Sequence, residues 1–241
     1  MARRLVLEGC HVEGVFEIMP FSTGLKRNIA QCLEDFNIPL YYNSTITNIF
    51  GQKRLESVEV TTTGSNEKKI IGCDTLLLSV GLIPENELAV SCGIDIDEDS
   101  GGPVVDQFFS TSREGIFSCG NSLFVNDLAD DVTRDAYKAA QSALDYLEGR
   151  KRGLPAISIK KGTGISQVVP QIICPNQDVE LKIRVRRPYE KAAICIKDTG
   201  FEKPKKYLSP GELLFVNIRE RDFKKHNLIN KKSLVLDIKE I

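Results

Sequence analysis

The stretch "ARRLVLEGCHVEGVFE", residues 2–17, decides the fold of the first part of the chain. Its opening residues have the character of the last turns of a helix, and Gly9 is a common helix terminator. The run that follows, "HVEGVFEIM" at 11–19, is apolar enough to form a buried strand, and the acidic Glu17 stands near its end. The order helix, strand, acid is typical of half of a nucleotide-binding β–α–β unit.

Glu17 carries the functional part of this interpretation. In such units an acidic residue hydrogen-bonds ribose hydroxyls about 20 residues after a glycine fingerprint. Counting back that far places the fingerprint before Met1, so the loop whose amides would hold a pyrophosphate is not in this chain. We therefore expect this chain to be a C-terminal portion of a nucleotide-binding protein.

The remaining elements predicted within residues 1–150 alternate helices with short strands. The first is a helix over 22–37 that Ser22 or Thr23 caps, and its apolar face carries Leu25, Ile29, Cys32, Leu33 and Phe36. A strand at 38–43, an antiparallel excursion over 44–64, a central parallel strand at 74–82 and a short helix over 85–93 follow. The last elements are strands at 104–111 and 115–121 and a helix over 131–149 that Asp131 or Thr133 caps. This order predicts an α/β fold with partial doubly wound nucleotide-binding domains.

The pattern of apolar and polar residues changes after residue 150. The stretch "RKRGLPA", 150–156, is polar and contains Gly and Pro, as linkers do. Residues 157–241 carry alternating apolar runs separated by turn residues, with no convincing helix, which predicts a small C-terminal all-β sandwich or barrel. We expect three domains, at 1–80, 81–150 and 151–241.

The motif "EDSGGPVV", 98–105, resembles the surroundings of a protease serine nucleophile. A serine nucleophile needs a base and a group that orients the base. The two histidines, His11 and His226, lie in unrelated contexts, and Asp, Ser, Gly and Pro are ordinary turn residues. The sequence therefore predicts a turn here and not a hydrolase.

Composition restricts the class of protein further. The 241 residues carry 32 basic and 33 acidic side chains, so the overall charge gives no reason to expect nucleic acid or an anionic membrane as a partner. No run of 18 apolar residues predicts a membrane span. The seven cysteines are dispersed and form no CxxC motif, so they indicate neither a metal site nor a disulfide framework. We expect the cysteines to be small buried apolar side chains of a protein in the reducing cytoplasm.

Several segments together resemble the FAD/NAD(P)-dependent pyridine nucleotide-disulfide oxidoreductase superfamily. They are "ARRLVLEGCHVEGVFEIMPFSTGLKRNIAQCLEDFNIPLYY" at 2–42, "CDTLLLSVGLIPENELA" at 73–89, "GGPVVD" at 101–106 and "GIFSCGN" at 115–121. The match is closest to the branch without a redox disulfide, which includes the flavin subunits of glycerol-3-phosphate dehydrogenase, opine oxidase and hydrogen cyanide synthase. The resemblance covers about residues 1–150.

The resemblance implies roles for seven residues. Glu17 would bind the ribose of NAD and disfavour NADP; Val80 and Gly81 would let the backbone approach the nicotinamide nucleotide; Gly120 and Asn121 match a Gly-Asp pair that holds the ribityl or phosphate part of FAD; and Val132 and Thr133 would lie where a helix N-terminus faces the flavin pyrimidine. Asn121 replaces the family's Asp, so an acceptor is kept and a charge is lost. The resemblance supplies no catalytic residue, and we expect no metal.

The implied function is hydride transfer between nicotinamide and flavin in an FAD-dependent NAD(P)H oxidoreductase. We expect FAD and NAD(H) in the intact protein, neither held tightly by this chain alone, so that the chain is weakly active or inactive alone. A partner dehydrogenase or oxidase subunit, or an oligomer, is compatible with the sequence. The alternative is a non-catalytic scaffold whose β domain docks a partner subunit.

Overall fold

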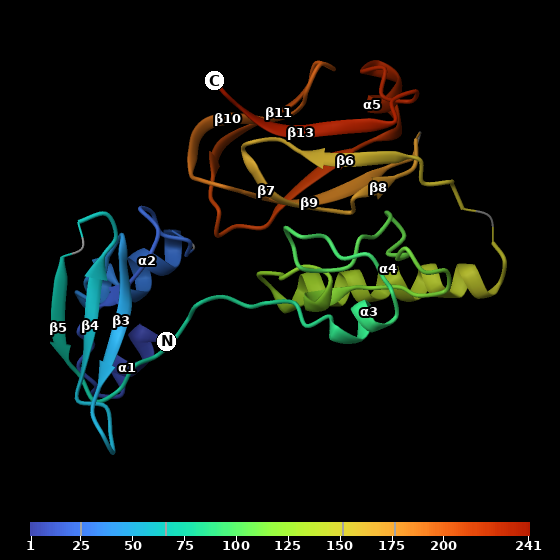
Figure 1. Ribbon diagram of the computed structural model, residues 1–241. Helices are drawn as coiled ribbons and strands as arrows, with labels where there is room; N and C mark the ends of the chain where they lie inside the picture. The colour runs from blue at the N-terminus through green and yellow to red at the C-terminus, as the bar shows by residue number, and fades with distance from the viewer. Residues whose placement is uncertain (25, 66, 151, 176) are drawn as a thin grey trace. The chain divides into compact units, whose positions relative to one another are not determined.

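The computed structural model describes all residues except 25, 66, 151 and 176 (Figure 1). The chain folds as two compact units, residues 1–80 and 81–241. The second unit contains both of the later domains expected from the sequence. The division into three domains therefore stays a prediction.

A pair of parallel strands anchors the first unit. Helix α1 (Ala2–Leu7) precedes strand β1 (Val15–Phe16), which pairs in parallel with β2 (Leu40–Tyr41). The crossover between the strands contains α2 (Lys26–Cys32) and the 3-10 helix η1 (Glu34–Phe36). Parallel strands need such a crossover, so the predicted order helix, strand, helix, strand is confirmed.

Two details of this unit differ from the sequence predictions. The first strand covers two residues of the predicted 11–19, and α2 begins at Lys26 and not beside Ser22 or Thr23. The Ser22 hydroxyl instead accepts the N–H of Gly24 (3.0 Å) in the turn before the helix. Leu25, predicted on the helix face, lies outside the described residues.

The antiparallel excursion predicted over 44–64 is confirmed by β3 and β4, and a third strand beyond it, β5, extends the sheet in the order β3-β4-β5. Its strands are β3 (Ser44–Phe50), β4 (Ser57–Thr62) and β5 (Lys68–Gly72). Val58 and Val60 on the central strand are buried, whereas Glu59 between them is on the other face. The alternation follows from the two-residue period of a strand.

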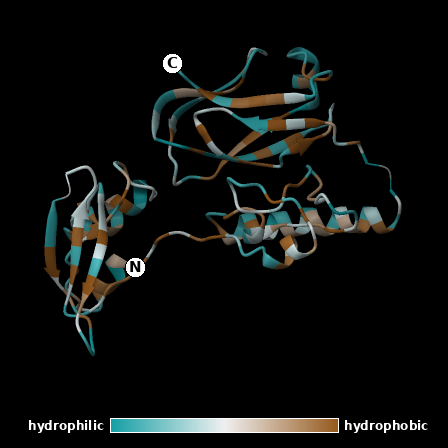
Figure 2. Cartoon of the chain, viewed as in Figure 1, coloured by the Kyte–Doolittle hydropathy of each residue, from teal (hydrophilic) through white to brown (hydrophobic). Residues whose placement is uncertain are grey.

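The prediction of a central parallel strand at 74–82 is wrong in this structure. No described residue of this run belongs to a strand, and four of its five Leu and Val side chains are exposed: Leu77 by 53%, Leu78 by 70%, Val80 by 88% and Leu82 by 68%. Figure 2 colours much of this run as hydrophobic. A strand requires neighbouring backbone to bond with, and none of the described residues pairs with this run.

Residues 81–150 form little regular structure before a long helix. They contain α3 (Glu87–Ser91), the 3-10 helix η2 (Gly120–Ser122) and α4 (Ala129–Leu147). The predicted strands at 104–111 and 115–121 are reduced to isolated bridges, such as Val105 with Thr111 and Ser110 with Phe117. Helix α4 begins two residues before the predicted cap at Asp131, with Leu128 as N-cap.

The rest of the second unit is a β domain, residues 157–241, built from two sheets. One has the order β11-β10-β13-β6-β8 and the other β12-β9-β7. The strands are β6 (Ile157–Lys161), β7 (Ile165–Val169), β8 (Ile172–Ile173), β9 (Val179–Val185), β10 (Tyr189–Ile196), β11 (Phe201–Leu208), β12 (Leu214–Ile218) and β13 (Ser233–Glu240).

Residues from both sheets share one core. Ile159, Ile194 and Leu236 of the first sheet cluster with Leu181 and Ile183 of the second, all buried. The domain is thus a sandwich, which is one of the two predicted forms. The sequence did not predict α5 (Glu220–Lys225), which Asp222 caps by accepting the Arg219 N–H (3.0 Å) and which buries Phe223.

The β domain completes the packing of residues 81–150. Val105 exchanges hydrogen bonds with residue 171: its N–H donates to the Gln171 Oε1 (3.0 Å) and its carbonyl accepts the Gln171 N–H (3.1 Å). Val105, Leu123 and Phe124 share a buried cluster with Val169 and Leu213 of the β domain. The irregular segment therefore takes part of its core and its backbone partners from the β domain.

Candidate functional site

Glu17 lies at the carboxyl end of β1, where its backbone extends the parallel pair. Its N–H donates to the Tyr41 carbonyl (2.8 Å), and its carbonyl accepts the N–H of Ser44 (2.9 Å). The carboxylate is held by its own loop, because Oε1 accepts the Met19 N–H (3.0 Å) and Oε2 accepts the Thr23 hydroxyl (2.8 Å). Each oxygen has a second lone pair, so the fixed carboxylate can still accept a hydroxyl from a ligand.

Val80 and Gly81 lie at the junction of the two units. Val80 is 88% exposed, and Gly81 has φ +94°, which only glycine adopts without strain. A Cβ at residue 81 would have nothing within 4 Å. The left-handed backbone conformation thus explains why residue 81 is a glycine. The close approach of a nucleotide to it stays a prediction.

Gly120 and Asn121 form the start of η2. Gly120 is buried with φ +70°, and a Cβ there would reach Val132 Cγ1 at 3.5 Å. The Asn121 Oδ1 accepts the N–H of Asn126 (3.1 Å) and so closes the loop toward α4. The Asn121 oxygen is engaged in this way, whereas its amide nitrogen has no hydrogen-bond partner among the described residues. Asn121 can therefore donate to a phosphate or ribityl oxygen.

The N-terminal end of α4 differs electrostatically from the sequence expectation. Asp130 and Asp131 stand in its first turn, and Asp131 pairs with Arg134 (3.1 Å). Carboxylates near a helix N-terminus are stabilised by its partial positive charge and offset that charge for other anions. Thr133 lies inside the helix and donates to the Ala129 carbonyl (3.1 Å), so its hydroxyl already has a partner.

The structure brings together one group of the predicted residues. Gly120, Asn121, Val132 and Thr133 are adjacent through η2 and the first turns of α4 in the second unit. Glu17 belongs to the first unit. The predicted site residues are therefore distributed over two units: Glu17 and Val80 belong to the first, and Gly81, Gly120, Asn121, Val132 and Thr133 belong to the second.

The protease alternative is not supported by the structure. Ser100 is buried, and its hydroxyl accepts the Gly102 N–H (3.3 Å) within the turn that also carries the bond from the Ser100 N–H to Asp97 Oδ2 (2.9 Å). The His226 ring contacts the Thr199 carbonyl (3.2 Å). The predicted turn over 98–103 is confirmed.

The cysteines do not behave as one class. Cys174 is buried, and its burial raises the pKa of the thiol to about 11. Cys10 and Cys92 are exposed, so the expectation of buried cysteines is wrong for these two. Among the residues that the structure describes, all seven thiols are free and no group of His, Cys, Asp and Glu side chains could hold a metal.

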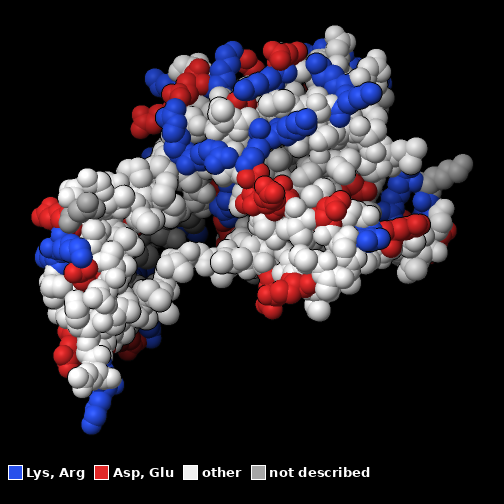
Figure 3. Space-filling model, viewed as in Figure 1, with Lys and Arg blue, Asp and Glu red and all other residues white. Residues whose placement is uncertain are grey.

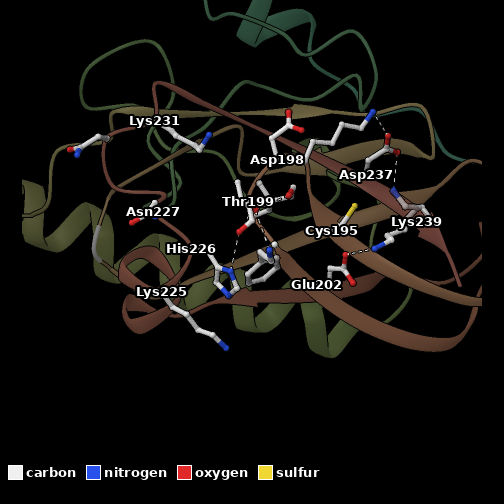
Figure 4. Close-up of a pocket in the computed structure, with 16 residues that line it drawn as sticks. Cys195, Asp198, Thr199, Glu202, Lys225, His226, Asn227, Lys231, Asp237 and Lys239 are labelled. Atoms are coloured by element: carbon white, nitrogen blue, oxygen red, sulfur yellow. Dashed lines mark hydrogen bonds and ion pairs between the residues drawn. The ribbon is translucent and has the colours of Figure 1, made fainter.

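A wide hollow in the β domain holds none of the predicted site residues (Figure 4). Its lysines and acids mostly pair with each other, as Lys197 does with Asp237 (2.7 Å) and Lys239 with Glu202 (2.6 Å). The hollow is wide and open, and internal pairing leaves little charge for a ligand. We therefore keep two candidate sites, Glu17 in the first unit and the Gly120–Asn121 loop in the second.

Comparison with known proteins decides the family. The pattern of the family "Pyridine nucleotide-disulphide oxidoreductase" matches residues 2–144, which is more than half of the chain.

The chain belongs to this family.

Thioredoxin reductases are among the similar proteins. That of Treponema pallidum is 28% identical over 120 residues, which are 48% of this chain and 37% of the relative. The crystal structure of T. acidophilum thioredoxin reductase has a TM-score of 0.51 and 28% identity, and the match covers 57% of this chain and 45% of that one. The large subunit of Escherichia coli (strain K12) nitrite reductase (NADH) is 32% identical over 76 residues, 32% of this chain and 9% of the relative.

The chain spans less than half the length of each of these three relatives. Family membership establishes a Rossmann-like oxidoreductase fold of flavoproteins and implies FAD and NAD(P)H as cofactors of an intact enzyme. Among the described residues, no helix is long and apolar enough to cross a membrane.

Sequence reasoning missed the residues that join the family segment to the β domain. Lys182 and Arg184 of β9 reach Asn126, Asp127 and Asp135 of the segment 81–150. Lys182 and Arg184 alternate with apolar residues along the strand, which predicts that both side chains lie on the solvent face of the sandwich. No local feature of the sequence indicates that another segment covers that face. Only their charge, in a strand with a buried face, marks them as unusual.

Proposed function

We propose that this chain is the part of an FAD-dependent NAD(P)H oxidoreductase that holds the nicotinamide nucleotide in residues 1–80 and part of FAD in residues 81–150. When bound, the two cofactors supply hydride transfer between nicotinamide and flavin. The residues of this chain bind and orient them. The observation that carries the proposal is the carboxylate of Glu17 at the carboxyl end of a parallel β–α–β pair in a member of this family.

Glu17 supplies both affinity and selectivity in this proposal. Its carboxylate is oriented in advance by Met19 and Thr23, so little conformational entropy is lost when it accepts ribose hydroxyls. A 2′-phosphate at the same place would bring two negative charges together. The proposal therefore expects NADH to bind more tightly than NADPH.

The loop at Gly120 and Asn121 can contact FAD through a side-chain donor and through its backbone. Asn121 offers amide hydrogens to an oxygen of FAD. Gly120 has a left-handed backbone and no side chain, so its backbone lies close to Val132. Because Asp130 and Asp131 occupy the first turn of α4, we infer that this helix end favours an uncharged part of FAD over a phosphate.

Exposed apolar side chains in each unit support the packing of a further polypeptide segment on this chain. Leu77 and Leu78 are exposed in the first unit, and Leu82, Leu144 and Leu147 are exposed in the second. Exposed apolar surface can mark an interaction site. We propose that the chain alone holds neither cofactor tightly and is weakly active or inactive. A partner dehydrogenase or oxidase subunit would supply or receive the electrons.

The test is a calorimetric titration of the full chain with NADH and with NADPH. We expect NADH to bind in the micromolar range, and Glu17→Ala to weaken it about tenfold, as expected for the loss of a charged hydrogen bond. The matched control is Glu13→Ala, an exposed acid near the same strand. Absence of NADH binding, or equal loss in both variants, contradicts the proposal and favours the non-catalytic scaffold.

A further inference from the structure

A second hollow of the β domain, of about 500 Å³, lies between the start of β11 and α5. It adjoins the wide hollow of Figure 4, and the two share Gly200, Phe201, Glu202, Lys225 and His226. None of the residues predicted to hold FAD or NAD lines the second hollow. It is therefore separate from both candidate nucleotide sites.

Three cationic side chains line this second hollow from two elements. Arg221 and Lys225 are four residues apart on α5 and so lie on the same face of that helix. Lys203 follows Phe201 by two residues on β11, so both side chains lie on the face of the strand where the His226 ring meets the Phe201 ring (5.6 Å between centroids). The Lys203 ammonium lies 5.2 Å from the centroid of the Phe201 ring. The strand and the helix thus bring their cations to one space.

The protein does not neutralise these three cations. Lys203, Arg221 and Lys225 form no ion pair or hydrogen bond with any residue that the structure describes. In the wide hollow, by contrast, two of the lysines are paired with acids. Three like charges that line one space repel one another, and a bound anion would remove this repulsion.

The two carboxylates of the lining are engaged with other groups. Asp222 is buried and accepts the Arg219 N–H at the start of α5 (3.0 Å). Glu202 pairs with Lys239 (2.6 Å), and Figure 4 shows this pair apart from Lys225. The second hollow therefore carries an excess of positive charge that is available to a ligand.

The number and kind of these donors indicate the class of ligand. A carboxylate has one negative charge, which would leave two of the three cations without a counter-charge. A phosphate monoester carries a charge of about −1.5 to −2 at pH 7 and presents three acceptor oxygens. The fork of the Arg221 guanidinium can donate to two of these oxygens, and each lysine adds a further donor. The volume is within the range of small-molecule sites, so an organic group on the phosphate also fits.

We propose that the second hollow binds a small phosphate monoester. The phosphate oxygens accept hydrogen bonds from Lys203, Arg221 and Lys225, and the organic group lies in the rest of the hollow. Binding needs neither FAD nor NADH and gives the β domain a ligand of its own.

The experiment titrates the full chain, labelled with nitrogen-15, with phenyl phosphate at constant ionic strength, because salt screens exposed charges. Amide signals of residues 200–203 and 221–226 should shift and saturate, with a dissociation constant below about 5 mM for a ligand of so few heavy atoms. Phenyl sulfate is the matched probe, since it has the same tetrahedral shape and one negative charge. We expect it to bind at least about threefold more weakly.

Three variants place the binding in this hollow. Arg221→Gln and Lys225→Gln each remove one lining charge, and each should weaken phenyl phosphate about threefold, with about tenfold for the double variant. Lys206→Gln is the matched control, because Lys206 is an exposed residue of β11 that lines neither hollow. It changes the net charge by the same amount and should leave the dissociation constant unchanged.

The amide spectrum of each variant also reports whether it is folded, and the three substituted residues are exposed. No saturable shift up to about 20 mM phenyl phosphate would overturn the proposal, since a specific ligand of this size binds more tightly. Equal affinity for the two probes, or an equal effect of Lys206→Gln and Arg221→Gln, would also overturn it, because binding would then reflect only the general charge of the β domain.

Discussion

Lys182 of β9 and Asp135 of α4 form a buried ion pair that ties the β domain to the segment 81–150. The pair is part of a wider charge complementarity. Residues 81–150 contain 4 basic and 14 acidic side chains, a net charge of −10, and residues 151–241 contain 20 basic and 10 acidic, a net charge of +10. Figure 3 shows Lys and Arg gathered over the β domain on the visible face. Opposite charges of this size favour docking of the two parts.

Breaking the buried pair should destabilise the second unit strongly. Lys182→Met leaves the Asp135 carboxylate buried without its cation, which costs about 3–5 kcal/mol of the free energy of unfolding. Urea denaturation followed by circular dichroism measures this loss.

A double variant and a surface pair make this prediction specific. Lys182→Met with Asp135→Leu should recover part of the loss, because no unpaired charge remains. Removing the exposed pair of Lys239 and Glu202 should cost no more than about 1 kcal/mol. A loss for Lys182→Met as small as that for the surface pair would show that the two parts are not held by this contact.

Asp237 should make the β domain sensitive to acid. Burial opposes its ionisation, but the Lys197 ammonium and the N–H groups of Gly164 and Ile238 outweigh burial and hold its pKa below the usual value. A lowered pKa in the folded state adds stability above the unfolded pKa of about 3.9 and loses it as pH falls through the folded pKa. The difference in unfolding free energy between wild type and Asp237→Asn should therefore shrink from pH 6 to about pH 2.

Denaturation at a series of pH values measures this difference. Asp198→Asn, an exposed neighbour, is the control and should follow the wild-type pH profile. A constant gap between wild type and Asp237→Asn over the whole range would mean that ionisation of Asp237 does not contribute.

Gly102 should tolerate no side chain. A Cβ at this position would lie 1.9 Å from the carbonyl oxygen of Leu123, which is backbone and cannot rotate away. We expect Gly102→Ala to lower the unfolding temperature of the second unit, with a cost of about 2 kcal/mol or more.

Calorimetry of the full chain records both units in one scan. Gly72→Ala is the control, since nothing lies within 4 Å of a Cβ at residue 72 and the change should be nearly neutral. Equal effects of the two substitutions would contradict the close packing of Gly102 against Leu123.

Local sequence patterns predicted much of the first unit and of the β domain. Alternation over residues 44–64 predicted an antiparallel sheet, and alternation over 157–241 predicted an all-β domain, because the side chains of a strand alternate between two faces. The helix over 131–149 was predicted from its capping residues, its alanines and the terminating Gly149, and its start was displaced because Leu128, and neither Asp131 nor Thr133, is the N-cap. These features depend on neighbours in the chain.

The run 74–82 shows where local patterns are insufficient. Its apolar residues predict a strand, but a strand forms only where other strands offer backbone partners, and none of the described residues does so for this run. The position of Glu17 beside Tyr41 was implied by the β–α–β pattern, whereas the grip of Met19 and Thr23 on its carboxylate required coordinates.

The sequence by itself determined that β9 has an apolar face, with Leu181 and Ile183, and a polar face, with Lys182 and Arg184. The tertiary structure alone decided that Lys182 is buried and Arg184 partly buried, because α4 and the loop before it cover this face with Asp135 and Asp127. A strand's alternation fixes which side chains share a face, but distant segments determine what each face meets. Burial and charge pairing therefore follow from contacts across more than forty residues of sequence.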